Sequence, residues 1–157
     1  MKKKSIVVYY SASGNTKIVA EKIQRAAGAD IQEIKPITPY VESYNELLKE
    51  AKGEIQKGVK RPIHPIDLSS YDVIYIGSPV WWGTVAPPLM TLIDENNLTG
   101  KIIAPFITHG GGGKGHSDRD LERACPDSTV TETLEIYGSG NRNSEKEIEE
   151  WLKKINL

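Results

Sequence analysis

Short apolar runs and stretches of helical periodicity alternate along the whole chain. Two runs, at 6–10 and 73–76, are continuous, β-branched and aromatic, which is typical of buried strands in a parallel sheet. Weaker patterns predict three further strands, at 31–34, 101–108 and 130–136. The first of these three is only half-alternating and two prolines follow it, so we expect it at an edge of the sheet.

Between these strands, apolar residues recur three or four positions apart and predict five helices. The predicted helices cover residues 18–27, 43–55, 89–93, 117–124 and 144–155. Ser43 and Ser144 open two of them, and a glutamate follows each serine by three residues, which predicts two capping boxes.

Five strands alternating with five helices predict a single α/β domain over residues 1–157, a length that suits one core. Such an alternation gives a doubly wound parallel sheet with helices on both faces and right-handed crossovers. Ligands of these sheets bind outside the carboxyl ends of the strands. The polar and glycine-rich segments after the first, third and fourth strands are therefore expected to form one site at one edge.

Composition narrows the function classes without choosing among them. Hydrophobic residues make up 38% and charged residues 26% of the chain, as in folded globular proteins. A net charge of −1 does not imply nucleic-acid binding, and the sequence has no basic stripe interleaved with aromatic residues. The single cysteine, Cys125, excludes an internal disulfide and a multi-cysteine metal site, and we expect it to be inert packing. No apolar run is long enough for a signal peptide or a membrane span, so a cytoplasmic location is expected.

The segment 11–16 joins the first strand directly to the first helix. Its hydroxyls, its successive backbone N–H groups and the positive end of the helix dipole converge on one spot, which favours an oxyanion such as a phosphate. The segment is neither a G-x-x-x-x-G-K-[ST] loop nor a G-x-G-x-x-G loop, so a terminal phosphate monoester is favoured. An ordinary turn with a serine or threonine helix cap is the alternative.

Two adjacent tryptophans, Trp81 and Trp82, stand between Pro79 and Gly83 after the third strand. The two side chains cannot both point the same way, so one ring is expected to pack inward and the other to cover a planar ligand. Gly83 lacks a Cβ, which lets the backbone present a carbonyl or an N–H to that ligand. The alternative is that both rings belong to the core.

A glycine run at 110–115 follows the fourth strand. It fits G-x-G-x-x-G formally, with Glu135 at a suitable distance for a dinucleotide site, but any polyglycine run fits that expression. Close backbone approach to a flat polar ring system and a flexible linker are the other interpretations. His109 and His116 flank the run with only Asp118 nearby, so no metal site is predicted, and the sequence has no G-x-S-x-G elbow for a hydrolase.

The chain resembles flavodoxins over nearly its whole length. The resemblance is carried by the segments S-x-S-G-N-T, S-P-V-W-W-G-T-V-A-P-P and T-H-G-G-G-G-K-G, and it is strongest with small flavodoxin-like proteins found mainly in bacteria. It implies an α/β flavodoxin-like fold, a doubly wound five-stranded parallel sheet of order 2-1-3-4-5. It also implies non-covalent FMN as the cofactor.

The same resemblance implies which residues bind the cofactor. The phosphate would be held by Ser11, Ser13, Gly14, Asn15 and Thr16. The isoalloxazine would be flanked by Pro79, Val80, Trp81, Trp82 and Gly83, with Trp82 stacking and Gly83 contacting the ring near flavin N5. Its pyrimidine side would be lined by Thr108, His109, Gly110, Gly111, Gly112 and Gly113. Tyr40 and Tyr44 are expected near the ring edge, and no catalytic side chain or metal is implied.

One departure from electron-carrier flavodoxins concerns charge. Those proteins are strongly acidic, whereas this chain is near neutral and places His109, Lys114 and His116 in or beside the third loop. Cations there would stabilise an anionic reduced flavin, so we expect a less reducing flavin.

The expected function is electron transfer between redox protein partners through bound FMN, by a monomer or weak dimer. The alternative is an FMN-dependent NAD(P)H:quinone or flavin reductase, which needs room for a hydride donor above the ring. A third interpretation is a flavin-free α/β domain that binds another phosphate or a partner protein.

Overall fold

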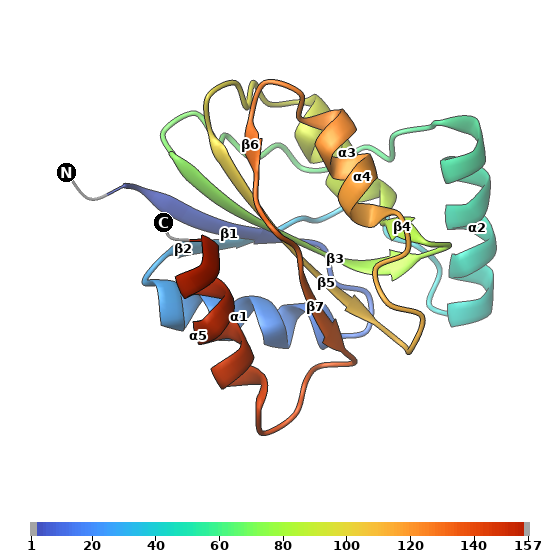
Figure 1. The fold of residues 1–157 in the computed structure, drawn as a ribbon. Coiled ribbons are helices and arrows are strands. Elements are labelled where there is room, and N and C mark those ends of the chain that lie inside the picture. Colours follow the sequence, from blue (N-terminus) through green and yellow to red (C-terminus); the bar gives the residue numbers. More distant parts are fainter. Residues whose placement is uncertain (1–2, 156–157) are drawn as a thin grey trace.

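The computed structural model describes residues 3–155, which form a twisted sheet with helices on both faces (Figure 1). The strands are β1 (Ser5–Tyr9), β2 (Asp30–Glu33), β3 (Val73–Trp81), β4 (Thr84–Val85), β5 (Ile102–His109), β6 (Thr129–Val130) and β7 (Leu134–Tyr137). The helices are α1 (Asn15–Ala27), α2 (Tyr44–Lys57), α3 (Pro87–Asp94), α4 (Ser117–Ala124) and α5 (Ser144–Ile155). No helix within these residues is long and apolar enough to cross a membrane.

The sheet has the order β2-β1-β3-β5, with β6 and β7 sharing the place beyond β5. All of these neighbours pair in parallel, and β4 alone pairs antiparallel, with the end of β3. When β6 and β7 are taken together as the fifth strand, the predicted flavodoxin-like order 2-1-3-4-5 is confirmed.

Each face of the sheet has its own core. Helices α1 and α5 cover one face, where Val7, Phe106 and Trp151 are buried. Helices α2, α3 and α4 cover the other face, over Ile76 and Leu89. Because both faces are covered, the central strands are apolar on both sides, which explains the continuous runs in the sequence.

The predicted strand at 130–136 is wrong as a single element, because β6 and β7 are separated at residues 131–133. Ile102 pairs with Thr129 and Phe106 with Leu134, so the outer strand holds one more residue than β5 over this span. Ile103 on β5 accepts a hydrogen bond from Thr131, and two residues later Pro105 faces the same way without an N–H to donate. The missing donor accounts for the bulge.

Neither predicted capping box forms. Ser43 does precede α2, but its exposed side chain makes no capping hydrogen bond. At α5 the helix begins at Ser144 itself, and the Ser144 hydroxyl accepts a hydrogen bond from the Asn141 N–H at 2.7 Å. The hydroxyl is thereby committed to the preceding turn instead of to Glu147.

Candidate functional site

Three loops leave the same edge of the sheet, at the carboxyl ends of β1, β3 and β5 (Figure 1). The parallel pairing of β3 with both neighbours fixes this placement. Two hydroxyls join the first loop to the third, because Thr16 Oγ1 and Thr108 Oγ1 lie 2.7 Å apart in a buried position. The three segments therefore meet, as the order of the elements predicts.

The first loop closes around a serine hydroxyl at the N-terminus of α1. Ser11 Oγ accepts hydrogen bonds from the N–H groups of Gly14 and Lys17, each at 3.2 Å. Gly14 is the N-cap residue with a φ of 96°, and the bond from the Lys17 N–H to Ser11 Oγ caps the first turn of α1, as in the alternative of a turn with a serine helix cap. The first turn of α1 contains no acidic residue, and its positive dipole end is therefore free to attract an anion.

The second segment is a tight hairpin instead of the open loop that the sequence suggests. β3 continues to Trp81, and Trp82 and Gly83 form the two-residue turn into β4 with φ values of 55° and 78°. Positive φ at both central positions is the pattern of a type I′ turn, which matches the twist of the paired strands. At Trp82, a non-glycine residue, this conformation costs on the order of 1–3 kcal/mol.

The two tryptophan rings diverge from this hairpin. Trp81 is 2% exposed and packs edge-on against Tyr10 and Tyr40, with ring centroids 5.6 and 5.4 Å away. Trp82 is 48% exposed, and its Nε1–H donates to the Leu48 carbonyl on α2 at 2.8 Å. The alternative in which both rings are core is therefore wrong, and Trp82 is the ring available to a ligand.

The glycine-rich loop is held by side chains at both of its ends. His109 Nδ1 accepts hydrogen bonds from the N–H groups of Gly111 at 3.0 Å and Gly113 at 3.2 Å. Glu135 Oε1 accepts from the Lys114 N–H at 2.9 Å, so this carboxylate serves the loop instead of pointing free toward a ribose. These bonds count against a flexible linker and weaken the dinucleotide interpretation.

The hairpin and the glycine-rich loop are joined directly. The His116 N–H donates to the Gly83 carbonyl at 2.7 Å. Beside this bond, a Cβ on Gly115 would lie only 2.5 Å from the Gly83 oxygen, so the close approach requires glycine. The hairpin and the glycine-rich loop are thus in direct backbone contact.

Two of the three basic side chains expected at the third loop, Lys114 and His116, lie against carboxylates. Lys114 Nζ lies 3.2 Å from Asp118 Oδ2, and His116 Nδ1 lies 2.6 Å from Asp120 Oδ2. Both carboxylates belong to the first turn of α4, where the helix dipole favours negative charge. This local pairing removes much of the reason for expecting a less reducing flavin.

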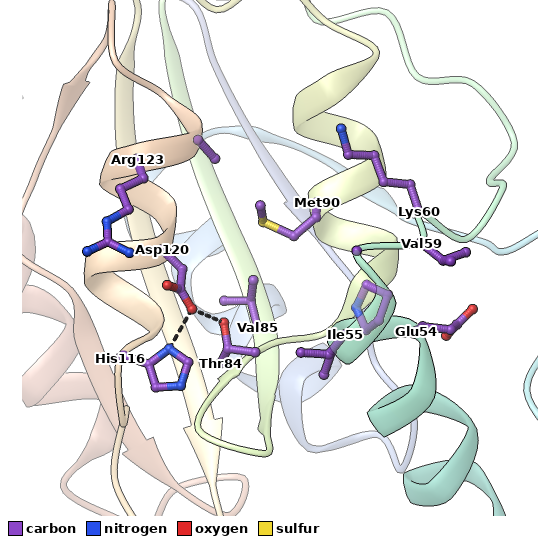
Figure 2. Close-up of a pocket in the computed structure, with 13 residues that line it drawn as sticks. Glu54, Ile55, Val59, Lys60, Thr84, Val85, Met90, His116, Asp120 and Arg123 are labelled. Atoms are coloured by element: carbon purple, nitrogen blue, oxygen red, sulfur yellow. Dashed lines mark hydrogen bonds and ion pairs between the residues drawn. The ribbon is translucent and has the colours of Figure 1, made fainter.

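Thr84 and Asp120 complete a cluster that sequence reasoning missed. Asp120 Oδ2 accepts a hydrogen bond from the Thr84 hydroxyl as well as contacting His116, as Figure 2 shows. Only the i,i+4 spacing of His116 and Asp120 could have indicated their contact. The cluster borders a cavity of about 410 Å³ between α2, β4, α3 and α4, whose inner wall is apolar, with Val85 and Met90 (Figure 2).

Beneath the hairpin, Tyr40 is bound to a buried charge cluster. Arg61 is 8% exposed, and its guanidinium lies 3.6 Å from the Tyr40 ring centroid and bonds to Glu50 at 2.5 Å and Glu54 at 3.2 Å. The Tyr40 hydroxyl donates to Glu54 at 2.5 Å, and burial together with this bond raises the pKa of Tyr40. Tyr40 is thus structural support for Trp81, and Tyr44 is exposed on α2.

Two further expectations concern metal and thiol chemistry. Cys125 is buried, and burial raises the pKa of its thiol to about 11, which agrees with inert packing. Among residues 3–155, no group of three or more His, Cys, Asp or Glu side chains is arranged to hold a metal ion.

Solved structures similar to this chain are flavoproteins. A flavoprotein from Bacteroides eggerthii is 32% identical, with a TM-score of 0.88 over 99% of both chains. A flavoprotein from Lactobacillus acidophilus, solved in complex with FMN, is 28% identical, with a TM-score of 0.76 over 96% of this chain and 99% of that one.

Sequence comparison adds a curated relative and a family. An NAD(P)H dehydrogenase (quinone) from Azorhizobium caulinodans is 30% identical over 125 residues, which are 69% of this chain. The chain spans only 59% of that relative's length. The profile of the flavodoxin family matches residues 4–155, nearly the whole described structure. With this match and the strand order in agreement, the chain belongs to the flavodoxin family.

Proposed function

We propose that this chain binds FMN non-covalently through its three loops and carries electrons between redox partners. The observation that carries the proposal is the meeting of an unneutralised helix N-terminus, an exposed tryptophan and a glycine-rich loop at one sheet edge. The FMN complex of the Lactobacillus acidophilus relative supports it. Residues 1–157 act as one flavodoxin-type domain, in which the flavin supplies the redox chemistry and the protein supplies position and electrostatics.

The first loop fits the phosphate of FMN. The N–H groups now turned to Ser11 Oγ and the other amides of the first helical turn are donors of the kind that a phosphate recruits. Ser13 and Asn15 are exposed at this turn, where their side chains can add to the backbone donors. The phosphate-binding residues in this proposal are Ser11, Ser13, Gly14, Asn15 and Thr16.

The other two loops fit a flat ring system. Glycines at the exposed crest of the third loop let the backbone come close to a ring, and the exposed face of Trp82 offers stacking worth roughly 0.5–1.5 kcal/mol beyond its buried area. In this proposal the ring lies among Pro79, Val80, Trp81, Trp82, Gly83, Thr108, His109, Gly110, Gly111, Gly112 and Gly113. Within this set Trp81 acts from the core, by supporting the hairpin.

An FMN-dependent NAD(P)H:quinone reductase is the second candidate function. The curated relative named NAD(P)H dehydrogenase (quinone) favours it. A carrier needs no general acid or base, and a reductase also needs space for the hydride donor beside the ring. Steady-state oxidation of NADPH or NADH with a benzoquinone acceptor separates the two, because a carrier without a partner reductase does not turn over.

The first experiment is to reconstitute the protein with FMN and to reduce it stepwise without oxygen. Binding is expected to quench flavin fluorescence at one equivalent of FMN. Reduction in two separate one-electron steps, seen in the visible spectrum, supports the carrier, and a single two-electron step supports the reductase. If the protein takes up no flavin, both the carrier and the reductase are contradicted, and a flavin-free domain that binds another phosphate is favoured.

The partners in this proposal are redox proteins that reach the exposed ring edge beside Trp82. We place the protein in the cytoplasm, as a monomer or weak dimer, and propose neither a nucleic acid nor a membrane as a partner. Sedimentation of the FMN-loaded protein over a range of concentrations measures the oligomeric state, and cell fractionation tests the location.

A further inference from the structure

One carboxylate on α4 touches two of the three loops at once. Asp120 lies in the first turn of α4, and Figure 2 shows its carboxyl group between His116 and Thr84. The same oxygen, Oδ2, accepts a hydrogen bond from Thr84 Oγ1 and lies 2.6 Å from His116 Nδ1. Thr84 directly follows the hairpin turn, whereas His116 ends the glycine-rich loop.

A backbone bond runs parallel to this carboxylate bridge. The His116 N–H donates to the Gly83 carbonyl at 2.7 Å, so His116 is tied to the hairpin by its main chain and, through Asp120, by its side chain. Thr84 is buried, so its bond to Asp120 is partly shielded from water, whereas the His116 side chain is 47% exposed and water reaches its bond to Asp120. A hydrogen bond to a charged carboxylate is shorter and stronger than one between neutral groups.

The hairpin needs such support because Trp82 has a φ of 55°. A bulky residue keeps a positive φ only where its surroundings hold it. Thr84 anchors the turn from the β4 side, and the Trp82 Nε1–H bond to Leu48 anchors it from α2. Without Asp120, the Thr84 hydroxyl has no carboxylate to bond to, and the turn loses its anchor on the β4 side.

We infer that Asp120 is a positioning residue, which sets the separation between the Trp82–Gly83 turn and the glycine-rich loop. This inference rests on the proposed function, because that separation is the space in which the flavin ring would lie. The hydrogen bonds of Asp120 go to Thr84 and His116 and not to the phosphate-binding residues of the first loop. Its effect is therefore on ring binding and not on phosphate binding.

Three variants test the inference. Asp120→Ala removes both hydrogen bonds, and Asp120→Asn keeps a carbonyl oxygen as acceptor while removing the charge. Glu122→Gln is the matched control, since Glu122 is an exposed carboxylate on the same helix. If the two hydrogen bonds of Asp120 hold the loops in place, Asp120→Asn keeps most of the wild-type amide protection and flavin affinity. If only the charge acts at a distance, Asp120→Asn and Glu122→Gln behave like Asp120→Ala.

The first readout needs no cofactor. Hydrogen exchange at the His116 amide, which is bonded to the Gly83 carbonyl, is expected to be about tenfold faster in Asp120→Ala than in wild type or Glu122→Gln. Exchange at amides of β1 serves as the internal reference. Unchanged exchange at His116 in a folded Asp120→Ala protein overturns the inference. If the alanine variant does not fold, Thr84→Val takes its place, because it removes the hydroxyl that bonds to Asp120, and unchanged exchange in Thr84→Val then overturns the inference.

The second readout separates the ring from the phosphate. Riboflavin has the ring without the phosphate. Asp120→Ala is therefore expected to weaken the binding of FMN and the binding of riboflavin by the same factor, about tenfold. Equal affinity in Asp120→Ala and wild type overturns the positioning role. If wild type binds neither compound, the proposed function fails, and the exchange measurement still decides whether Asp120 joins the two loops.

Discussion

At Gly115 the separation between two loops depends on a single missing methyl group. The residue has a φ of 57°, and a Cβ there would lie 2.5 Å from the Gly83 oxygen and 2.7 Å from the Gly83 Cα. Both the conformation and the lack of space exclude a side chain, and the atoms in the way belong to rigid backbone. The contact therefore transmits any change at Gly115 directly to the hairpin.

Gly115→Ala is expected to lower the free energy of unfolding by about 2 kcal/mol and to weaken FMN binding, because the hairpin must move away. Urea unfolding and a fluorescence titration with FMN measure the two effects. Gly100→Ala is the control, since Gly100 also has a positive φ, 77°, but lies outside the three loops, and a Cβ there meets no atom within 4 Å. Equal changes in unfolding free energy and FMN affinity in the two variants would show that the hairpin and the glycine-rich loop can move apart at little cost.

Trp82→Ala and Trp81→Ala are expected to differ in kind. Trp82 is exposed, so its loss should leave stability within about 1 kcal/mol of wild type while weakening FMN binding roughly tenfold. Trp81 is buried, so its loss should cost about 3–5 kcal/mol of stability. Thermal unfolding and FMN titration measure both effects. Unchanged FMN affinity in Trp82→Ala would show that the Trp82 ring does not stack on the flavin.

At the scale of elements, Arg61 joins α2 to the segment that precedes it. Its guanidinium bonds to Glu50 and Glu54 on α2 and to the carbonyls of Thr38 and Pro39, at 3.0 and 3.2 Å. The same group lies over Tyr40, which supports Trp81 from below. The position of the hairpin therefore depends on a charge that is nearly inaccessible to water.

Arg61→Met is expected to lower the free energy of unfolding by about 3 kcal/mol, because it leaves Glu54 in a mostly buried position without its cation. Lys60→Met is the control, since the ion pair of Lys60 with Asp94 is exposed and is worth less than about 1 kcal/mol. Chemical unfolding at neutral pH measures both variants. A loss in Arg61→Met no larger than in Lys60→Met would contradict the structural role of the cluster.

The elements themselves could be predicted to a large extent from the sequence. All five helices and the positions of the main strands follow from periodicity, because strands buried on both faces leave continuous apolar runs. The order of the strands in the sheet was implied by the resemblance to flavodoxins and not by periodicity. The bulge opposite Pro105 could not be predicted, since it depends on which way the proline faces in the sheet. The hairpin was missed because Trp82 at positive φ contradicts the ordinary preference of tryptophan.

At the scale of the molecule, the buried tyrosines limit stability at high pH. Burial raises the pKa of Tyr10 to about 12, so in the folded protein this hydroxyl stays protonated where an unfolded tyrosine has ionised. The unfolded state then binds fewer protons than the folded one, and stability is lost as the pH rises from about 10 through about 12. Below pH 10 the contribution is fully present.

Urea unfolding between pH 9 and 12 is expected to show a free energy of unfolding that falls by at most about 1 kcal/mol per pH unit for Tyr10, once solvent screening is allowed for. Tyr10→Phe should flatten this fall, because phenylalanine does not ionise. Tyr44→Phe should leave it unchanged, since Tyr44 is exposed. A slope that is the same in all three proteins would assign the alkaline loss to other groups.

The candidate site was partly accessible from the sequence. Its three loops carry local patterns of hydroxyls, tryptophans and glycines, and chain order alone brings such loops to one sheet edge. Asp120 and Thr84 carry no such pattern, because their contact joins a helix to a hairpin 36 positions earlier. The pairing of Lys114 with Asp118 and of His116 with Asp120 was visible only as an i,i+4 spacing, and net charge gave no indication of it.

The bulge at Pro105 also has a consequence for how copies of the protein meet. It divides the outer edge of the sheet into strands of two and four residues, and the opposite edge, β2, has only four. A strand from another molecule that aligned with either edge would run out of backbone partners after a few hydrogen bonds. Growth into fibres by edge-to-edge addition is therefore disfavoured from the native state, even at high protein concentration.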